Sequence, residues 1–286
     1  MGRRVRARAL AILSPRRKRL PASARVALVV VVGLWVVALC SPLLRERARS
    51  IHLDDRLQPP SLAHPCGTDD LGRDLLARIV TATPISLAIG LVAAAVSLIV
   101  GFAVGAAAGY FGGAIDIALS RLIEVMLCFP VLFLLLALAA FLPPSPATVI
   151  AAIGLTTWAG DARFARAEIL KMKELDYTRA ARAMGASTPR ILLRHLLPNA
   201  LPPLIVSAAF GVGWAILAEA SLSFLGVGLP APAVSWGGIL SSSANWIEEA
   251  WWIALFPGLA LFLTVSAYNL LAEGLRTVTT EGGRNA

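Results

Sequence analysis

The chain has 286 residues, of which 57% are hydrophobic and 15% are charged, and its formal net charge is +9. In soluble globular domains, roughly a quarter of the residues are charged. This composition therefore excludes an ordinary soluble protein and indicates a membrane protein with several spans. The positive charge does not indicate nucleic-acid binding, because it lies between apolar stretches in the way that Lys and Arg flank membrane spans.

The N-terminal region combines a basic tail, predicted over residues 1–25, with an apolar stretch over 26–44. That stretch has 19 residues, which is longer than the apolar part of a usual signal peptide, and no small-residue cleavage site follows it. We therefore expect it to be retained as the first transmembrane helix.

An external loop with a short helix is predicted over residues 45–83. We expect a solvated loop in which Thr68 caps the short helix and Asp69 and Asp70 lie in its first turn. The spacing of the His, Cys and acidic residues fits no common metal site. These residues are His52, Asp54, Asp55, His64, Cys66, Asp69 and Asp70.

The second span is predicted within the uncharged stretch 79–115. Small residues recur there at every fourth position, and this spacing lets another helix approach closely. That helix comes either from this chain or from a second subunit. The small residues are Ala93, Ser97, Gly101, Gly105 and Gly109.

Four more spans complete a predicted five-helix domain over residues 84–276. The uncharged stretch 125–160 is interrupted by proline-rich residues 142–148, which predicts a third span ending near Phe141 and a fourth beginning near Ala147. The fifth and sixth spans are predicted at 201–225 and within 249–273, followed by a C-terminal tail, 277–286.

Six spans place both termini on one side of the membrane. That side carries 20 of the 26 Lys and Arg residues, so it is predicted to be cytoplasmic. The other six, all Arg between residues 45 and 78, are a mild departure from this rule.

The cytoplasmic loop over 161–199 is too long for a simple connection. Strong helix formers over 174–184 predict a helix, and Gly185 fits the left-handed position that ends it. Ser187 or Thr188 then caps a second helix that is expected to end at Pro198.

The first of these helices is predicted to carry a docking face. Ala180, Ala181 and Met184 lie three or four residues apart and so share one side of the helix. A small apolar patch with a basic rim suits either a cytoplasmic protein partner or an anionic lipid surface. The rim residues are Arg179, Arg182, Arg190 and Arg194.

This loop resembles that of ABC-importer permeases, which carry Glu-Ala-Ala, three residues, Gly, nine residues and then Ile-x-Leu-Pro. The chain has Arg179-Ala180-Ala181, then Gly185, then His195-Leu196-Leu197-Pro198 at the same spacing, with Arg and His in place of Glu and Ile. Five further segments resemble the C-type permease of dipeptide, oligopeptide and nickel importers. They are HPCGTDDLGRDLLARIV, GYFGG, RHLLPNALPPLIV, AILAEASLSFLGVG and ALFPGLALFLTVSAYNLLAEGLR.

The resemblance implies an all-α membrane protein with the type I ABC importer permease fold, six transmembrane helices and a cytoplasmic helix-Gly-helix coupling loop. It also implies a second homologous permease subunit, two ATPase subunits and an external solute-binding protein. The implied ATPase-docking residues are Asp176, Tyr177, Arg179, Ala180, Ala181, Met184, Gly185, Ala186 and Pro198.

The chain is not expected to hydrolyse ATP. Its only lysines are Lys18, Lys171 and Lys173, and none follows a glycine, so the phosphate-binding P-loop is absent. ATP and Mg are therefore expected on the partner subunits, and no catalytic residue, cofactor or metal is assigned to this chain. Among charges within spans, Glu219 and Glu124 are assigned either to the pathway or to bonds between helices, and Arg121 can pair with Glu124.

The predicted function is that of the permease subunit of an ATP-driven peptide importer, multi-pass in the bacterial cell membrane. It would form half of the pathway and couple it to separate ATPases. The alternatives are an importer of nickel or another small solute, an ion-driven secondary transporter, and a membrane-anchored adaptor that binds ATPases but has no pathway.

Overall fold

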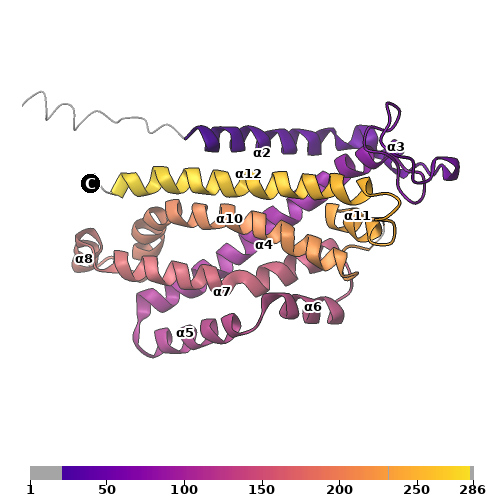
Figure 1. Ribbon diagram of the computed structural model, residues 1–286. Coiled ribbons are helices and arrows are strands. Elements are labelled where there is room, and N and C mark those ends of the chain that lie inside the picture. The colour runs from indigo at the N-terminus through magenta and orange to yellow at the C-terminus, as the bar shows by residue number, and fades with distance from the viewer. Residues whose placement is uncertain (1–20, 231, 284–286) are drawn as a thin grey trace, which may run out of the picture.

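The computed structural model describes residues 21–230 and 232–283, so residues 1–20 of the predicted basic tail lie outside it. The regular structure within these ranges is helical, which confirms the all-α fold class. Figure 1 shows α2 (Ala22–Cys40), α12 (Trp252–Gly283) and α10 (Leu197–Phe224) lying side by side, while α4 (Leu75–Phe111) crosses behind them.

Four helical stretches of the described residues are long and apolar enough to cross a membrane. They are Ala22–Arg49, Leu75–Phe111, Thr188–Phe224 and Trp252–Val278. They match the predicted first, second, fifth and sixth spans, so the chain is a multi-pass membrane protein.

The predicted third span is broken and not continuous. α5 (Gly113–Cys128) and α6 (Val131–Phe141) meet at an angle of 88°, a geometry that fits either a broken span or a re-entrant loop. The break follows from Pro130, which has no N–H to donate and disfavours helical geometry at Phe129, whose backbone is extended.

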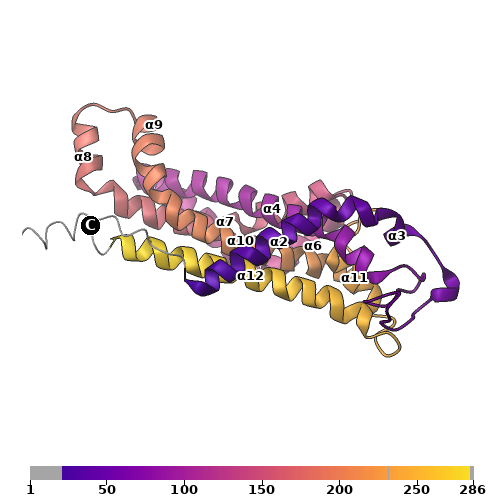
Figure 2. The ribbon, with the colours of Figure 1, turned by 90° about the horizontal axis from the view of Figure 1, so that it is seen from above.

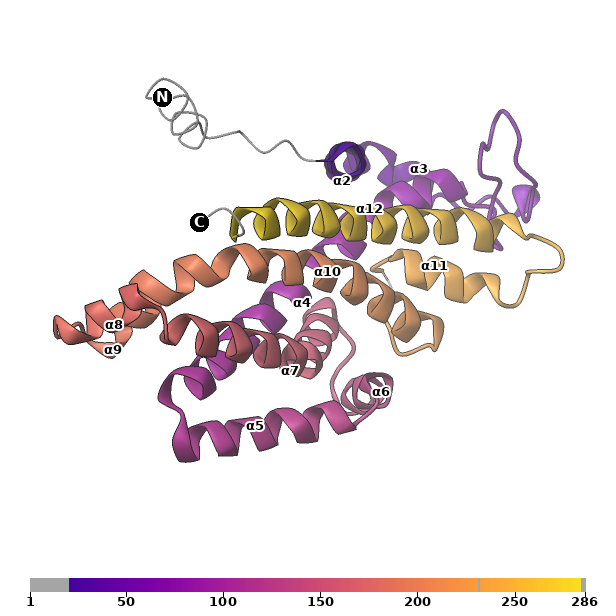
Figure 3. The same cartoon turned by 60° about the vertical axis from the view of Figure 1, so that its left-hand side comes forward.

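The predicted fourth span is α7 (Pro146–Lys173), which Ser145 caps by accepting a hydrogen bond from the Thr148 N–H. Its charge-free part ends at Gly160, so it is too short and too polar to count as a span by length and composition. By length and composition, four stretches of the described residues qualify as spans, or five with the bent pair, and the six crossings stay a prediction. Figure 3 shows α7 lying between α5 and α10, so much of its surface is covered by other helices of the chain.

Three predicted boundaries were wrong. The first helix ends at Cys40 and not at residue 44, because a 3-10 turn, η1 (Ser41–Leu44), follows it. α4 begins at Leu75, well before residue 84, because Asp74 caps it there. α12 continues to Gly283 through the predicted C-terminal tail, since no proline interrupts it.

The glycine stripe of α4 packs against α7 of the same chain. A Cβ atom at Gly105 would lie 2.2 Å from the Ala162 carbonyl oxygen, and one at Gly101 would lie 2.6 Å from the Asp161 Cβ. These distances are too short for any side chain, so glycine allows the two backbones to touch. The predicted close approach is confirmed, and the helix that approaches belongs to this chain.

Candidate functional site

The helix-Gly-helix segment projects from one end of the bundle. Figure 3 shows α8 (Asp176–Ala183) and α9 (Thr188–Arg190) beyond the end of α12, and Figure 2 shows them at the end opposite α3 (Arg45–Arg49). The predicted start at residue 174 was early, because α7 continues to Lys173 and only a short turn precedes α8.

Gly185 forms the corner after α8, as predicted. Its φ is +77°, a conformation that costs a residue with a side chain about 1–2 kcal/mol. The Gly185 N–H donates to the Arg182 carbonyl at 3.0 Å, and the Ala186 N–H donates to the Ala181 carbonyl at 3.1 Å. These two bonds form the Schellman arrangement that satisfies the last carbonyls of a helix.

One face of α8 is held against the rest of the protein. Thr178 is fully buried, and its hydroxyl donates to the Met172 carbonyl at 2.9 Å, next to the end of α7. Ala181 is 2% exposed, and Ala186 packs on a buried cluster that includes Met172 and Ile191. Ala181 was therefore assigned wrongly to the outer face, because the turn of the helix directs it, with Thr178, towards the protein.

Tyr177 and Ala180 of α8 and Met184, which directly follows it, are exposed and share one side because they are spaced three and four residues apart. Met184 is 81% exposed, and it lies outside the four stretches that are long and apolar enough to cross a membrane. The exposed Arg179 donates to Glu174 at 2.7 Å, and this hydrogen bond holds the pKa of Glu174 below its usual range. We call Tyr177, Ala180 and Met184 the α8 face.

The second helix of the segment does not end at Pro198 as predicted. α9 continues through a π-helical turn, Ile191–Leu196, directly into α10. The wider π turn accommodates Pro198, which has no N–H to donate to the preceding turn. Asn199 lies in the same region, and its side-chain amide donates to the His195 carbonyl at 2.6 Å. Thr188–Phe224 is therefore one continuous helical stretch, which joins the projecting segment to the bundle.

Asp161, which no part of the sequence interpretation singled out, joins three helices. Its carboxylate on α7 accepts hydrogen bonds from Ser97 of α4 at 2.6 Å and from Ser207 of α10 at 2.8 Å. The signal that could have found it is an acid that directly follows the uncharged stretch 125–160. Because α7 precedes α8 and α10 follows α9, Asp161 connects the two helices that carry the projecting segment.

A second contact joins the broken span to α7. Arg166 of α7 donates to both carboxylate oxygens of Asp116 on α5, at 2.5 and 2.7 Å. This bidentate geometry is the strong form of an Arg–carboxylate pair. Through these two contacts, α4, α5 and α10 are all linked to α7.

The two glutamates assigned to the pathway or to helix contacts have different surroundings. Glu219 is fully buried, and its Oε1 accepts from Ser223 at 2.7 Å and from Ser235, which caps α11 (Trp236–Ser243), at 2.6 Å. Glu124 is exposed and accepts from Arg121 at 2.7 Å, as the spacing predicted. Glu219 of α10 thus bonds to the start of α11, as expected for a contact between helices, and its role in the pathway stays a prediction.

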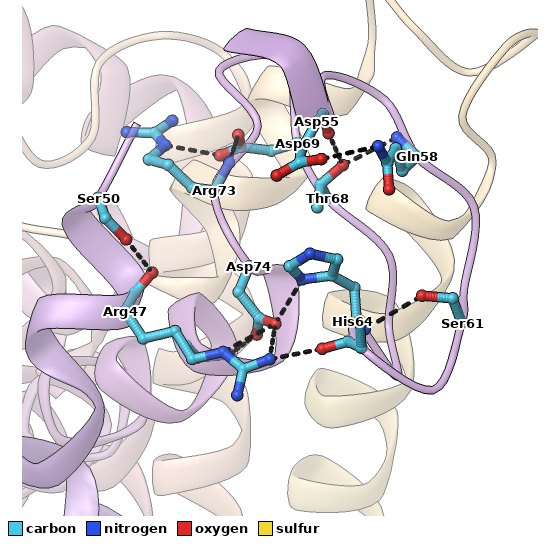
Figure 4. A network of polar contacts seen from close by, with 12 residues as sticks. Arg47, Ser50, Asp55, Gln58, Ser61, His64, Thr68, Asp69, Arg73 and Asp74 are labelled. Atoms are coloured by element: carbon cyan, nitrogen blue, oxygen red, sulfur yellow. Dashed lines mark hydrogen bonds and ion pairs between the residues drawn. The ribbon is translucent and has the colours of Figure 1, made fainter. Parts of the chain in front are cut away.

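The predicted solvated loop at the opposite end is a compact polar cap (Figure 4). Asp69 is fully buried and forms ion pairs with Arg73 at 2.7 Å and with Arg78. Thr68 does not cap a helix, because its hydroxyl accepts from the Gln58 N–H at 2.8 Å. In the part of the chain that the structure describes, His, Cys and acidic side chains form no metal-holding group.

The cap is also tied to α4. Asp74 caps α4 through the Ala77 N–H at 2.8 Å, and its other oxygen accepts from Arg47 at 2.8 Å and lies 2.9 Å from His64 Nδ1. Figure 4 shows these side chains converging from α3, the loop and the start of α4. Solvation of Asp69 was predicted wrongly, because the fold encloses it with Arg73 and Arg78 inside the cap.

Comparison with known proteins identifies the family. Residues 97–279 match the family described as binding-protein-dependent transport system inner membrane component. The chain belongs to this family. It is 39% identical over 252 residues to the dipeptide transport system permease protein DppC of Alkalihalophilus pseudofirmus, covering 88% of this chain and 83% of that protein.

Other relatives agree with this assignment, and a solved structure shares the fold. A putative peptide transport system permease protein of Brucella suis is 40% identical, covering 93% of this chain and 90% of that protein. The oligopeptide transport system permease protein OppC of Bacillus subtilis is 34% identical over 88% of this chain and 83% of that protein. A chain in an inward-facing structure of the MetNI methionine ABC transporter shares the fold, with a TM-score of 0.54 and 19% identity over 70% of this chain and 96% of that chain.

Proposed function

We propose that this chain is one of two homologous permease subunits of an ATP-driven peptide importer in the bacterial cell membrane. Two ATPase subunits hold the ATP and Mg, and an external solute-binding protein delivers the peptide. The chain forms half of the pathway, with both termini in the cytoplasm. Relatives described as dipeptide and oligopeptide permeases support the peptide substrate.

The observation that carries the proposal is the α8 face. It is an exposed apolar patch on a segment that projects from the bundle, and it contains Met184, a flexible side chain suited to irregular partner surfaces. Exposed apolar side chains gathered in this way indicate a contact with another protein. An ATPase bound there would move α8 against the end of α7.

Transmission of this movement follows from the covalent and hydrogen-bonded connections. α8 is bonded to the end of α7 through Thr178, and Gly185 joins it to the continuous helix that includes α10. Asp161 holds α7 and α10 at a fixed spacing beside α4. Displacement of α8 by a partner would therefore move α7, α10 and α4 together with it.

A cysteine crosslinking experiment tests the docking surface. Met184→Cys, on the α8 face, is expected to crosslink to a cysteine introduced into the ATPase when the complex is assembled in membranes. Ala181→Cys is the matched control, because it is one turn away but 2% exposed. Crosslinking of Met184→Cys to lipid analogues alone, with no ATPase product, would contradict the proposal.

Uptake measurements test the substrate and the energy source. Cells whose only peptide importer contains this chain are expected to accumulate a labelled tripeptide and to lose that uptake when ATP is depleted. Accumulation of labelled nickel in place of the peptide would favour the small-solute alternative. Peptide uptake that survives ATP depletion under an intact ion gradient would favour a secondary transporter.

A further inference from the structure

An arginine-lined cavity of about 810 Å³ lies at the end of the bundle opposite α8. Its walls come from α3, the beginning of α4 and the residues that follow α10. The charged lining residues are Arg45, Arg49, Arg73 and Arg78. No acidic side chain lines this cavity.

The cavity carries an excess of positive charge. Arg73 and Arg78 share the buried Asp69, and Arg73 also lies 3.8 Å from Asp70. Within the described residues, Arg45 and Arg49 form no ion pair, and they lie one turn apart on α3. Four guanidinium groups therefore face two carboxylates, which leaves the site attractive to an anion.

The remaining lining is mostly apolar. Along α4 it passes from Arg78 through Thr81 to Pro84 and Ile85, so charge gives way to apolar surface within two turns. The residues that follow α10 contribute more of the apolar wall, namely Leu229, Pro232, Ala233 and Val234. The cavity is thus basic at one end and apolar at the other.

We propose that this cavity binds an anionic phospholipid, with its headgroup phosphate on Arg45 and Arg49 and part of an acyl chain on the apolar wall. The planar guanidinium presents paired donors that match phosphate oxygens. The apolar wall gains from covering by a hydrocarbon chain. In the orientation proposed above, this lipid belongs to the outer leaflet.

The chemistry of the lining distinguishes a lipid from a peptide. A peptide brings an ammonium group and backbone N–H donors, and among the lining side chains only the Thr81 hydroxyl can accept a hydrogen bond. The phosphate and ester oxygens of a phospholipid are acceptors, which arginine satisfies. A lipid site also gives a role to Arg45 and Arg49 among the six arginines on the less positive side. The cap uses Arg47, Arg73 and Arg78, and the Arg56 Cζ lies 4.6 Å from the centroid of the Trp246 ring.

The test measures phosphatidylglycerol retained by the purified importer complex in nanodiscs of phosphatidylcholine with and without phosphatidylglycerol, read by native mass spectrometry. The double variant Arg45→Gln/Arg49→Gln is expected to bind phosphatidylglycerol roughly 30-fold more weakly, since each basic residue near a membrane surface contributes about 1 kcal/mol. The charge-matched control is Arg121→Gln/Arg163→Gln, whose side chains are exposed and lie outside the cavity.

A second variant distinguishes the loss of lipid binding at this cavity from a general effect of removing charge and from misfolding. Ala233→Trp keeps every arginine but fills the cavity from a loop, and it is expected to displace the lipid as well. Equal retention of phosphatidylglycerol by wild type and both cavity variants would overturn the proposal. Displacement of the lipid by trialanine, but not by its C-terminal amide, would also overturn it and assign the site to a peptide carboxylate.

Discussion

Replacing Gly185 by valine tests how the corner after α8 works. Gly185 has φ +77°, and an added Cβ would meet no other atom within 4 Å, so the substitution changes backbone preference and not packing. The left-handed conformation costs about 1–2 kcal/mol for residues with a side chain. An energy of this size lowers the population of the corner roughly 5- to 30-fold.

The corner determines whether α8 keeps its position. α8 has only eight residues, which is too short for a stable isolated helix, so it depends on the corner and on the contacts of Thr178 and Ala181. We therefore expect Gly185→Val to insert in the membrane normally but to transport much less substrate per ATP hydrolysed. Reconstituted vesicles with all partner subunits allow uptake and ATP hydrolysis to be measured together.

Two controls identify the backbone as the cause. Asn tolerates the left-handed region better than most residues with a side chain, so Gly185→Asn is expected to retain most of the coupling. Gly33→Val places the same side chain in α2, also with no atom within 4 Å, and is expected to leave coupling intact. Normal coupling in Gly185→Val, or equal loss in Gly185→Asn, would refute this reasoning.

Three further predictions address packing, polar contacts and topology. Gly105→Ala would push α4 away from Ala162 and is expected to lower the free energy of unfolding by about 1–3 kcal/mol, read from thermal unfolding in detergent; an unchanged midpoint would contradict the packing. Asp161→Ala leaves two serine hydroxyls without their acceptor and is expected to cost about 1–3 kcal/mol and to reduce coupling, whereas full coupling would exclude its linking role. The pKa of the Cys66 thiol is raised, first by burial and then by the nearby Asp74. An impermeant maleimide added outside the cell is therefore expected to modify Cys66 slowly at neutral pH and faster at alkaline pH. Modification only from the cytoplasmic side would reverse the proposed topology.

Local features of the sequence were sufficient for the helical class, most spans and the glycine corner. These depend on interactions within one segment: apolar length against bilayer thickness, the small-residue repeat of α4, and the left-handed conformation at Gly185. The same locality explains why the pairing of Arg121 with Glu124 could be predicted from a spacing of three residues.

Only the tertiary structure decided which groups face one another across the chain. Asp161 meets Ser97 and Ser207 over separations of 64 and 46 residues, and the buried Asp69 is compensated by an arginine on α4. Ala181 faces the protein and not a partner because α8 folds back against the end of α7. Sequence periodicity identifies the residues on each side of a helix, but the packing of neighbouring helices determines which side is buried.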